Sequence, residues 1–95
     1  MKPYKILIVD DELSVRASLK EWFLEDGFKV ETAESGEDAL NKMHAGPYDI
    51  ILLDIKMPGM DGITLQKKIK KITPQAIIII MTAYASVDTA VEALK

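Results

Sequence analysis

The 95-residue sequence contains no cysteine, which excludes disulfide bonds, thiolate metal ligands and cysteine nucleophiles. It also has no apolar run of about 18 residues, the length that a helix needs to cross a bilayer. Its first residues lead into a short apolar segment instead of the core of a signal peptide. We therefore expect a cytoplasmic protein with no membrane partner.

Positive charge is scarcer than negative charge. Lysine and arginine number 12 against 15 aspartates and glutamates, which gives a net charge of -3 at pH 7. Because contacts to nucleic-acid phosphates need clustered basic side chains, we expect no direct nucleic-acid contact by this domain. The length, with 48% hydrophobic and 28% charged residues, is typical of one soluble globular domain.

Short apolar runs alternate along the chain with apolar residues at helical spacing. The runs at 6–9, 50–53 and 77–81 are uninterrupted and rich in β-branched residues, which predicts parallel strands covered on both faces. Residues 28–33 alternate apolar and polar side chains, which predicts a strand at the edge of the sheet.

A helix is expected after each of these strands. Ser14, Ser35 and Ser86 are expected N-caps of the first, second and fourth helices, and Gly27 is placed to end the first in a left-handed conformation. The resulting β-α alternation indicates an α/β fold, a doubly wound parallel sheet with right-handed crossovers and helices on both faces.

Acidic side chains follow two of the predicted strands at their carboxyl ends. Asp10 and Asp11 follow the first strand, and Asp54 follows the third. Ligands bind at this edge of open α/β sheets, and if the two strands are neighbours the three carboxylates converge and repel one another. A divalent cation removes that conflict, and Mg²⁺ prefers such oxygen ligands. One acid could simply cap a helix, but three favour a metal site.

Three motifs, in order along the chain, resemble those of response-regulator receiver domains. They are the first strand with its acidic pair at 6–12, the segment 54–62 that resembles D-x-x-M-P-x-M-D-G, and Met81-Thr82-Ala83-Tyr84. The segment 81–91 also resembles receivers of nitrogen-regulator-type transcription activators. The resemblance implies the flavodoxin-like receiver fold, with strand order 2-1-3-4 here and a fifth strand and helix in the family.

The resemblance also implies roles for individual acidic residues. Asp54 would be the phosphoacceptor, modified by a sensor histidine kinase in a Mg²⁺-dependent reaction. Asp11, the Asp54 carboxylate and the backbone carbonyl of Lys56 would bind Mg²⁺, with Asp10 acting through a coordinated water.

Two residues after the fourth strand would contact the phosphoryl group. By resemblance, these are the Thr82 hydroxyl and the Ala83 backbone amide, and movement of Thr82 would switch an output, expected to be transcription. The domain is thus expected to be a phosphoacceptor signalling domain and not an enzyme, although it assists its own phosphorylation and dephosphorylation.

The sequence departs from the family pattern at its C-terminal end. The family's fifth strand, the lysine at its tip and the fifth helix have no counterpart among the 95 residues, since Lys95 belongs to a helical pattern. We therefore expect a receiver domain over 1–95 that is truncated, lacks its output domain and is impaired in phosphorylation. Strand 77–81 would be an exposed apolar edge that self-associates, by pairing or by exchanging elements.

Other functions remain open at the level of sequence. One is a receiver scaffold that acts as a self-associating interaction module without phosphotransfer. An Asp-nucleophile phosphatase is weakened because Asp54-Ile55-Lys56 lacks a second acid. Nucleotide or flavin binding is weaker still, because no glycine-rich phosphate cradle is present.

Overall fold

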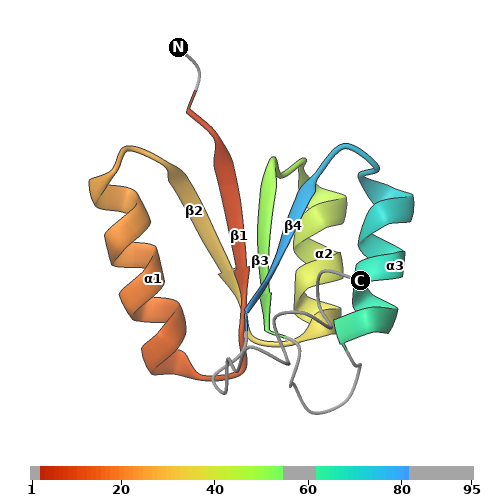
Figure 1. Ribbon diagram of the computed structural model, residues 1–95, viewed down its shortest axis with the longest axis horizontal. Helices are drawn as coiled ribbons and strands as arrows, with labels where there is room; N and C mark the ends of the chain where they lie inside the picture. Colours follow the sequence, from red (N-terminus) through yellow and green to blue (C-terminus); the bar gives the residue numbers. More distant parts are fainter. Residues whose placement is uncertain (1–2, 55–61, 82–95) are drawn as a thin grey trace.

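The computed structural model describes residues 3–54 and 62–81, and strands alternate with helices throughout them (Figure 1). The elements are β1 (Lys5–Val9), α1 (Leu13–Glu25), β2 (Lys29–Ala33), α2 (Gly36–Ala45), β3 (Ile50–Asp54), α3 (Gly62–Ile72) and β4 (Ile77–Met81). The expected α/β order is confirmed over these residues. The fourth helix, expected after Ser86, lies outside them.

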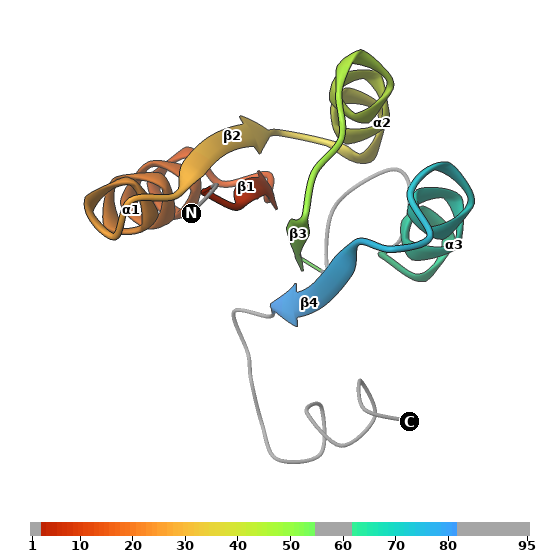
Figure 2. The ribbon, with the colours of Figure 1, turned by 90° about the horizontal axis from the view of Figure 1, so that it is seen from above.

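The strands form one parallel sheet in the order β2-β1-β3-β4. Figure 2 shows α1 on one face of this sheet and α2 and α3 on the other, so the sheet is doubly wound. This confirms the expected strand order and the edge position of β2. It also makes β1 and β3 neighbours, with Val9 opposite Leu53, which brings their carboxyl ends side by side.

The core lies on both faces of the two central strands. Leu7, Val9, Ile51 and Leu53 belong to the apolar cluster that α2 and α3 cover, and their exposed fractions are all 0%. The alternate residues of β1 and β3 belong to a second cluster, against which α1 packs partly buried side chains. These uninterrupted runs of β1 and β3 therefore lie between helices on both faces, as predicted.

β4 differs from this expectation within the described part of the chain. Ile77 and Ile79 are 60% and 47% exposed, although the run from 77 to 81 is as apolar as those of β1 and β3. The reason is position: β4 lies last in the sheet order, and α1 lies over β1 and β2 at the opposite side (Figure 2). The prediction that helices cover both faces of β4 is wrong here, whereas the expected exposed edge is present.

The helix ends confirm two expectations and correct one. The Ser35 hydroxyl accepts a hydrogen bond from the Asp38 amide at 3.1 Å, and Gly27 has φ +90° after α1. Ser14 is not an N-cap, because α1 already begins at Leu13.

No helix among the described residues is long and apolar enough to cross a membrane.

Candidate functional site

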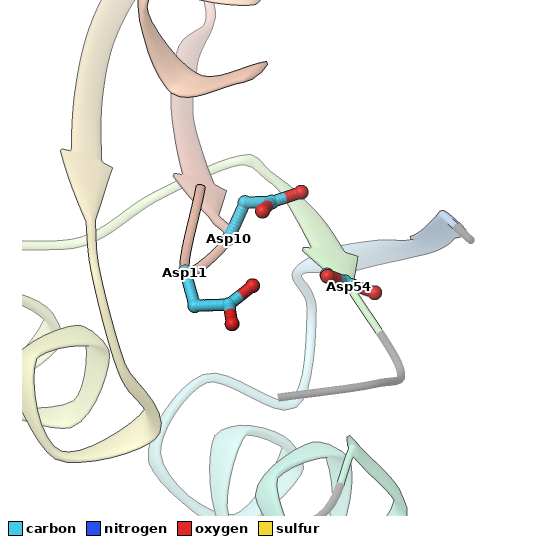
Figure 3. Close-up of side chains that lie close together, drawn as sticks. All are labelled: Asp10, Asp11 and Asp54. Atoms are coloured by element: carbon cyan, nitrogen blue, oxygen red, sulfur yellow. The ribbon is translucent and has the colours of Figure 1, made fainter. Parts of the chain in front are cut away.

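Three carboxylates meet at the carboxyl edge of the sheet. Asp54 is the last residue of β3, and Asp10 and Asp11 follow β1 directly, so the pairing of these two strands brings them together. One carboxylate oxygen from each residue lies within 4.8 Å of the others, and Figure 3 shows all three at the tips of β1 and β3. The convergence that depended on β1 and β3 being neighbours is therefore confirmed.

The three residues differ in their access to solvent. Asp10 and Asp54 are buried, with exposed fractions of 6% and 8%, whereas Asp11 is exposed. Removing charged carboxylates from water carries a large free-energy cost unless hydrogen bonds or cations compensate it. The cluster therefore combines two buried carboxylates with one that solvent reaches.

Asp10 is held by hydrogen bonds to three different atoms. Its amide donates to the carbonyl oxygen of Ala33 at 3.1 Å, and its Oδ1 accepts a hydrogen bond from the Glu12 amide at 2.9 Å. Its carbonyl oxygen accepts a hydrogen bond from Arg16 Nη1 at 2.7 Å. The carboxylate of Asp10 thus accepts a hydrogen bond from the amide of Glu12, the residue that precedes α1.

The donor set and its spacing fit a divalent metal ion. In an octahedral Mg²⁺ site with bonds of about 2.1 Å, neighbouring oxygens are about 3 Å apart and opposite oxygens about 4 Å. The 4.8 Å spread among Asp10, Asp11 and Asp54 is slightly wider. A small side-chain rotation, or a water molecule between the ion and one carboxylate, closes that difference. All three side chains offer hard oxygen donors, the type that Mg²⁺ prefers.

Sequence reasoning missed one residue at this site and named three that the structure does not describe. Lys56, Thr82 and Ala83 lie outside the described residues, so their roles stay predictions. Arg16, near the start of α1, was overlooked. The positive end of the helix dipole disfavours a basic side chain at that position, so its presence there could have indicated a specific hydrogen-bond partner.

The fold and the site together define a doubly wound α/β domain with a cation-compatible acidic cluster at its carboxyl edge. The family model described as "Response regulator receiver domain" matches residues 6–95. The chain belongs to this family and is a receiver domain of two-component response regulators, which are signalling domains.

Curated relatives and a solved structure agree with this membership. ZraR, a transcriptional regulatory protein of Klebsiella oxytoca, is 47% identical over 94 residues, covering 95% of this chain and 20% of ZraR. The DNA-binding transcriptional regulator NtrC of Klebsiella pneumoniae is 43% identical over 88 residues, covering 93% and 19%. TrrA of Thermotoga maritima, solved with Mg²⁺ and BeF, is 42% identical with a TM-score of 0.82, covering 96% of this chain and 79% of TrrA.

These matches confirm the resemblance to nitrogen-regulator-type receivers. They also show that the chain spans about a fifth of the length of such curated regulators.

Proposed function

We propose that this domain accepts a phosphoryl group on Asp54 from a sensor histidine kinase and thereby switches an output, transcription being the best supported. The observation that carries the proposal is the meeting of Asp10, Asp11 and Asp54 within 4.8 Å at the sheet edge. A second structure of TrrA, 45% identical to this chain, contains it in complex with the histidine kinase ThkA, which supports a kinase as the partner. The relatives ZraR and NtrC support transcription as the output.

The three acids divide the work of binding a metal ion and reacting. We propose that Asp11, Asp54 and the carbonyl oxygen of Lys56 hold Mg²⁺, with Asp10 acting through a water molecule. The ion would neutralise charge on the phosphoryl oxygens. Asp10, whose Oδ1 already accepts a hydrogen bond from the Glu12 amide, is the member best suited to an indirect role.

The reaction itself needs a nucleophile and hydrogen-bond donors. A carboxylate oxygen of Asp54 forms a bond to phosphorus while the phosphorus–nitrogen bond of the kinase phosphohistidine breaks, and the histidine nitrogen keeps the electron pair. Thr82 and Ala83 donate hydrogen bonds to the phosphoryl oxygens, and movement of Thr82 toward them transmits the signal.

Phosphorylation by a small phosphodonor such as acetyl phosphate tests the proposal without a kinase. With Mg²⁺, the intact mass should gain one phosphate, and Asp54→Asn should abolish the gain while Asp26→Asn, an exposed acid after α1, retains it. Phosphate on the Asp54→Asn protein would contradict the assignment. Steady release of phosphate from phosphate esters would indicate a phosphatase instead.

A second candidate function is supported by β4. Its exposed Ile77 and Ile79 lie on the last strand in the sheet order of the described residues. Such an apolar edge can add a further strand through its backbone. We propose that a second copy of the chain pairs there, as an interaction module that needs no phosphotransfer, and molar mass in solution tests it.

A further inference from the structure

Arg16 occupies an unexpected place for a basic residue. It lies near the N-terminal end of α1, where the helix dipole disfavours positive charge. Its side chain is half-buried, and Nη1 donates a hydrogen bond of 2.7 Å to the carbonyl oxygen of Asp10. This short, charge-assisted contact compensates the unfavourable position.

The bonded carbonyl belongs to the peptide group that joins Asp10 to Asp11. Its orientation therefore sets the direction in which the Asp11 backbone leaves β1. The Asp10 amide and Oδ1 are held as well, by Ala33 and by the Glu12 amide. With the Arg16 contact included, the position of Asp10 and the plane of the peptide after it are both fixed.

We propose that Arg16 is a positioning residue that orients the Asp10–Asp11 peptide so that both carboxylates reach one divalent cation together with Asp54. This inference rests on the proposed function only in assuming that these three acids bind a metal ion. Arg16 acts through the carbonyl oxygen of Asp10 and does not itself contact the ion.

Removing Arg16 has two opposite effects on the affinity for a cation. The direction in which the affinity changes therefore tests the proposal. Loss of a nearby positive charge, taken alone, strengthens cation binding by Coulomb's law. Loss of the hydrogen bond frees the peptide group and weakens binding, because the site then has to be ordered by the ion. We infer that the second effect is larger.

Mn²⁺ serves as a spectroscopic probe for Mg²⁺, and its electron paramagnetic resonance signal reports the free ion directly. Arg16→Met should weaken Mn²⁺ binding about three- to tenfold, the range expected for one lost hydrogen bond. Arg16→Lys should give an affinity between those of Arg16→Met and the unchanged chain. Lys20→Met is the matched control, because Lys20 is an exposed cation one turn further along α1, and its loss should leave affinity equal or slightly higher.

Circular dichroism at the temperature of the binding measurement verifies that each variant is folded. For a folded variant, a lower free energy of unfolding does not by itself change the measured Mn²⁺ affinity. Equal or tighter Mn²⁺ binding by folded Arg16→Met would overturn the proposal. If that variant does not fold, Arg16→Lys decides, and an affinity equal to that of the unchanged chain would overturn it.

Asp11→Asn separates this proposal from the proposed metal site. Weakened binding by Asp11→Asn together with unchanged binding by Arg16→Met refutes only the role of Arg16. Absence of Mn²⁺ binding by the unchanged chain refutes the metal site and the role of Arg16 together.

Discussion

Asp11 differs from its two neighbours in the acidic cluster because it is exposed, whereas Asp10 and Asp54 are almost completely buried. Replacing it should therefore disturb the fold little while removing one charged group from the proposed metal site. The carboxylate of Asp10 also accepts a hydrogen bond from the Glu12 amide. Replacing Asp10 would therefore alter the turn before α1 as well as the proposed metal binding.

Asp11→Asn should weaken Mg²⁺ affinity at least about tenfold while leaving the unfolding temperature nearly unchanged, because a neutral amide is a poorer ligand for a hard cation. Isothermal titration calorimetry measures the affinity, and Asp26→Asn is the control for loss of one exposed acid. Unaltered affinity in Asp11→Asn would remove this residue from the set of ligands.

Tyr48 supplies a residue-scale prediction far from the acidic cluster. Burial of the ring, and then the nearby Glu31 and Asp38 carboxylates, raise the pKa of the Tyr48 phenol above its ordinary value near 10. The unfolded chain consequently loses this proton at a lower pH than the folded chain does. The raised pKa of Tyr48 therefore adds to the free energy of unfolding. This contribution is complete below pH of about 10 and is lost as the pH rises through the folded-state pKa.

Between pH of about 9 and 11, the free energy of unfolding should therefore fall less steeply for Tyr48→Phe than for the unchanged chain. Urea unfolding at several pH values measures this slope. Tyr4→Phe is the comparison, because it removes the same hydroxyl group from an exposed ring. Parallel slopes for Tyr48→Phe and the unchanged chain would contradict the stated cause.

At the scale of elements, α2 has a side-chain N-cap and α1 does not. Ser35 caps α2, whereas α1 begins after Glu12, whose side chain makes no capping hydrogen bond. Ser35→Ala should lower the free energy of unfolding by about 1 kcal/mol, since the Asp38 amide loses its acceptor. Denaturant unfolding checks this, and Ser18→Ala in the exposed interior of α1 should cost less or even stabilise.

The elements were predictable because their signals are local. Uninterrupted apolar runs indicated β1 and β3, alternation indicated the edge strand β2, and Gly27 marked the end of α1. The start of α1 was mispredicted because the helix begins at Leu13 with Glu12 at its N-cap, and not after Ser14. Nothing in local sequence spacing distinguishes those two arrangements.

The candidate site was predictable to the extent that it follows from strand ends. Asp10, Asp11 and Asp54 could be named because parallel strands deliver their carboxyl ends to one edge. The Arg16 contact could not, because it depends on how the loop after β1 turns back toward α1. Likewise, the exposure of Ile77 and Ile79 depends on which strands the helices cover, a property of the assembled sheet.

At the scale of the molecule, residues 3–54 and 62–81 place helices on both faces of the central strands and leave β4 last in the sheet order. Ile63 on α3 is as exposed as Ile77, at 59% and 60%, but it lies on a helix and not at the edge of the sheet. Among the residues that the structure describes, β4 therefore combines exposed apolar side chains with a sheet edge that can accept a strand.

Self-association through β4 should appear as a molar mass above that of one chain by light scattering at high micromolar concentration. Ile79→Lys should shift the protein toward a monomer, because a charge on an edge strand opposes strand pairing. Ile63→Lys adds the same charge to α3 and should leave the mass unchanged. A monomeric unchanged chain, or equal effects of the two variants, would refute this proposal.

The central claim is that Asp54 is the phosphoacceptor, and identifying the residue that carries the phosphoryl group tests it most directly. Borohydride reduction of the chain after treatment with acetyl phosphate and Mg²⁺ converts an aspartyl phosphate to homoserine, which peptide mass spectrometry then locates. The account predicts homoserine at position 54 and only when Mg²⁺ is present. Reduction at Asp10, Asp11 or Glu12 instead, or at no position, would contradict it.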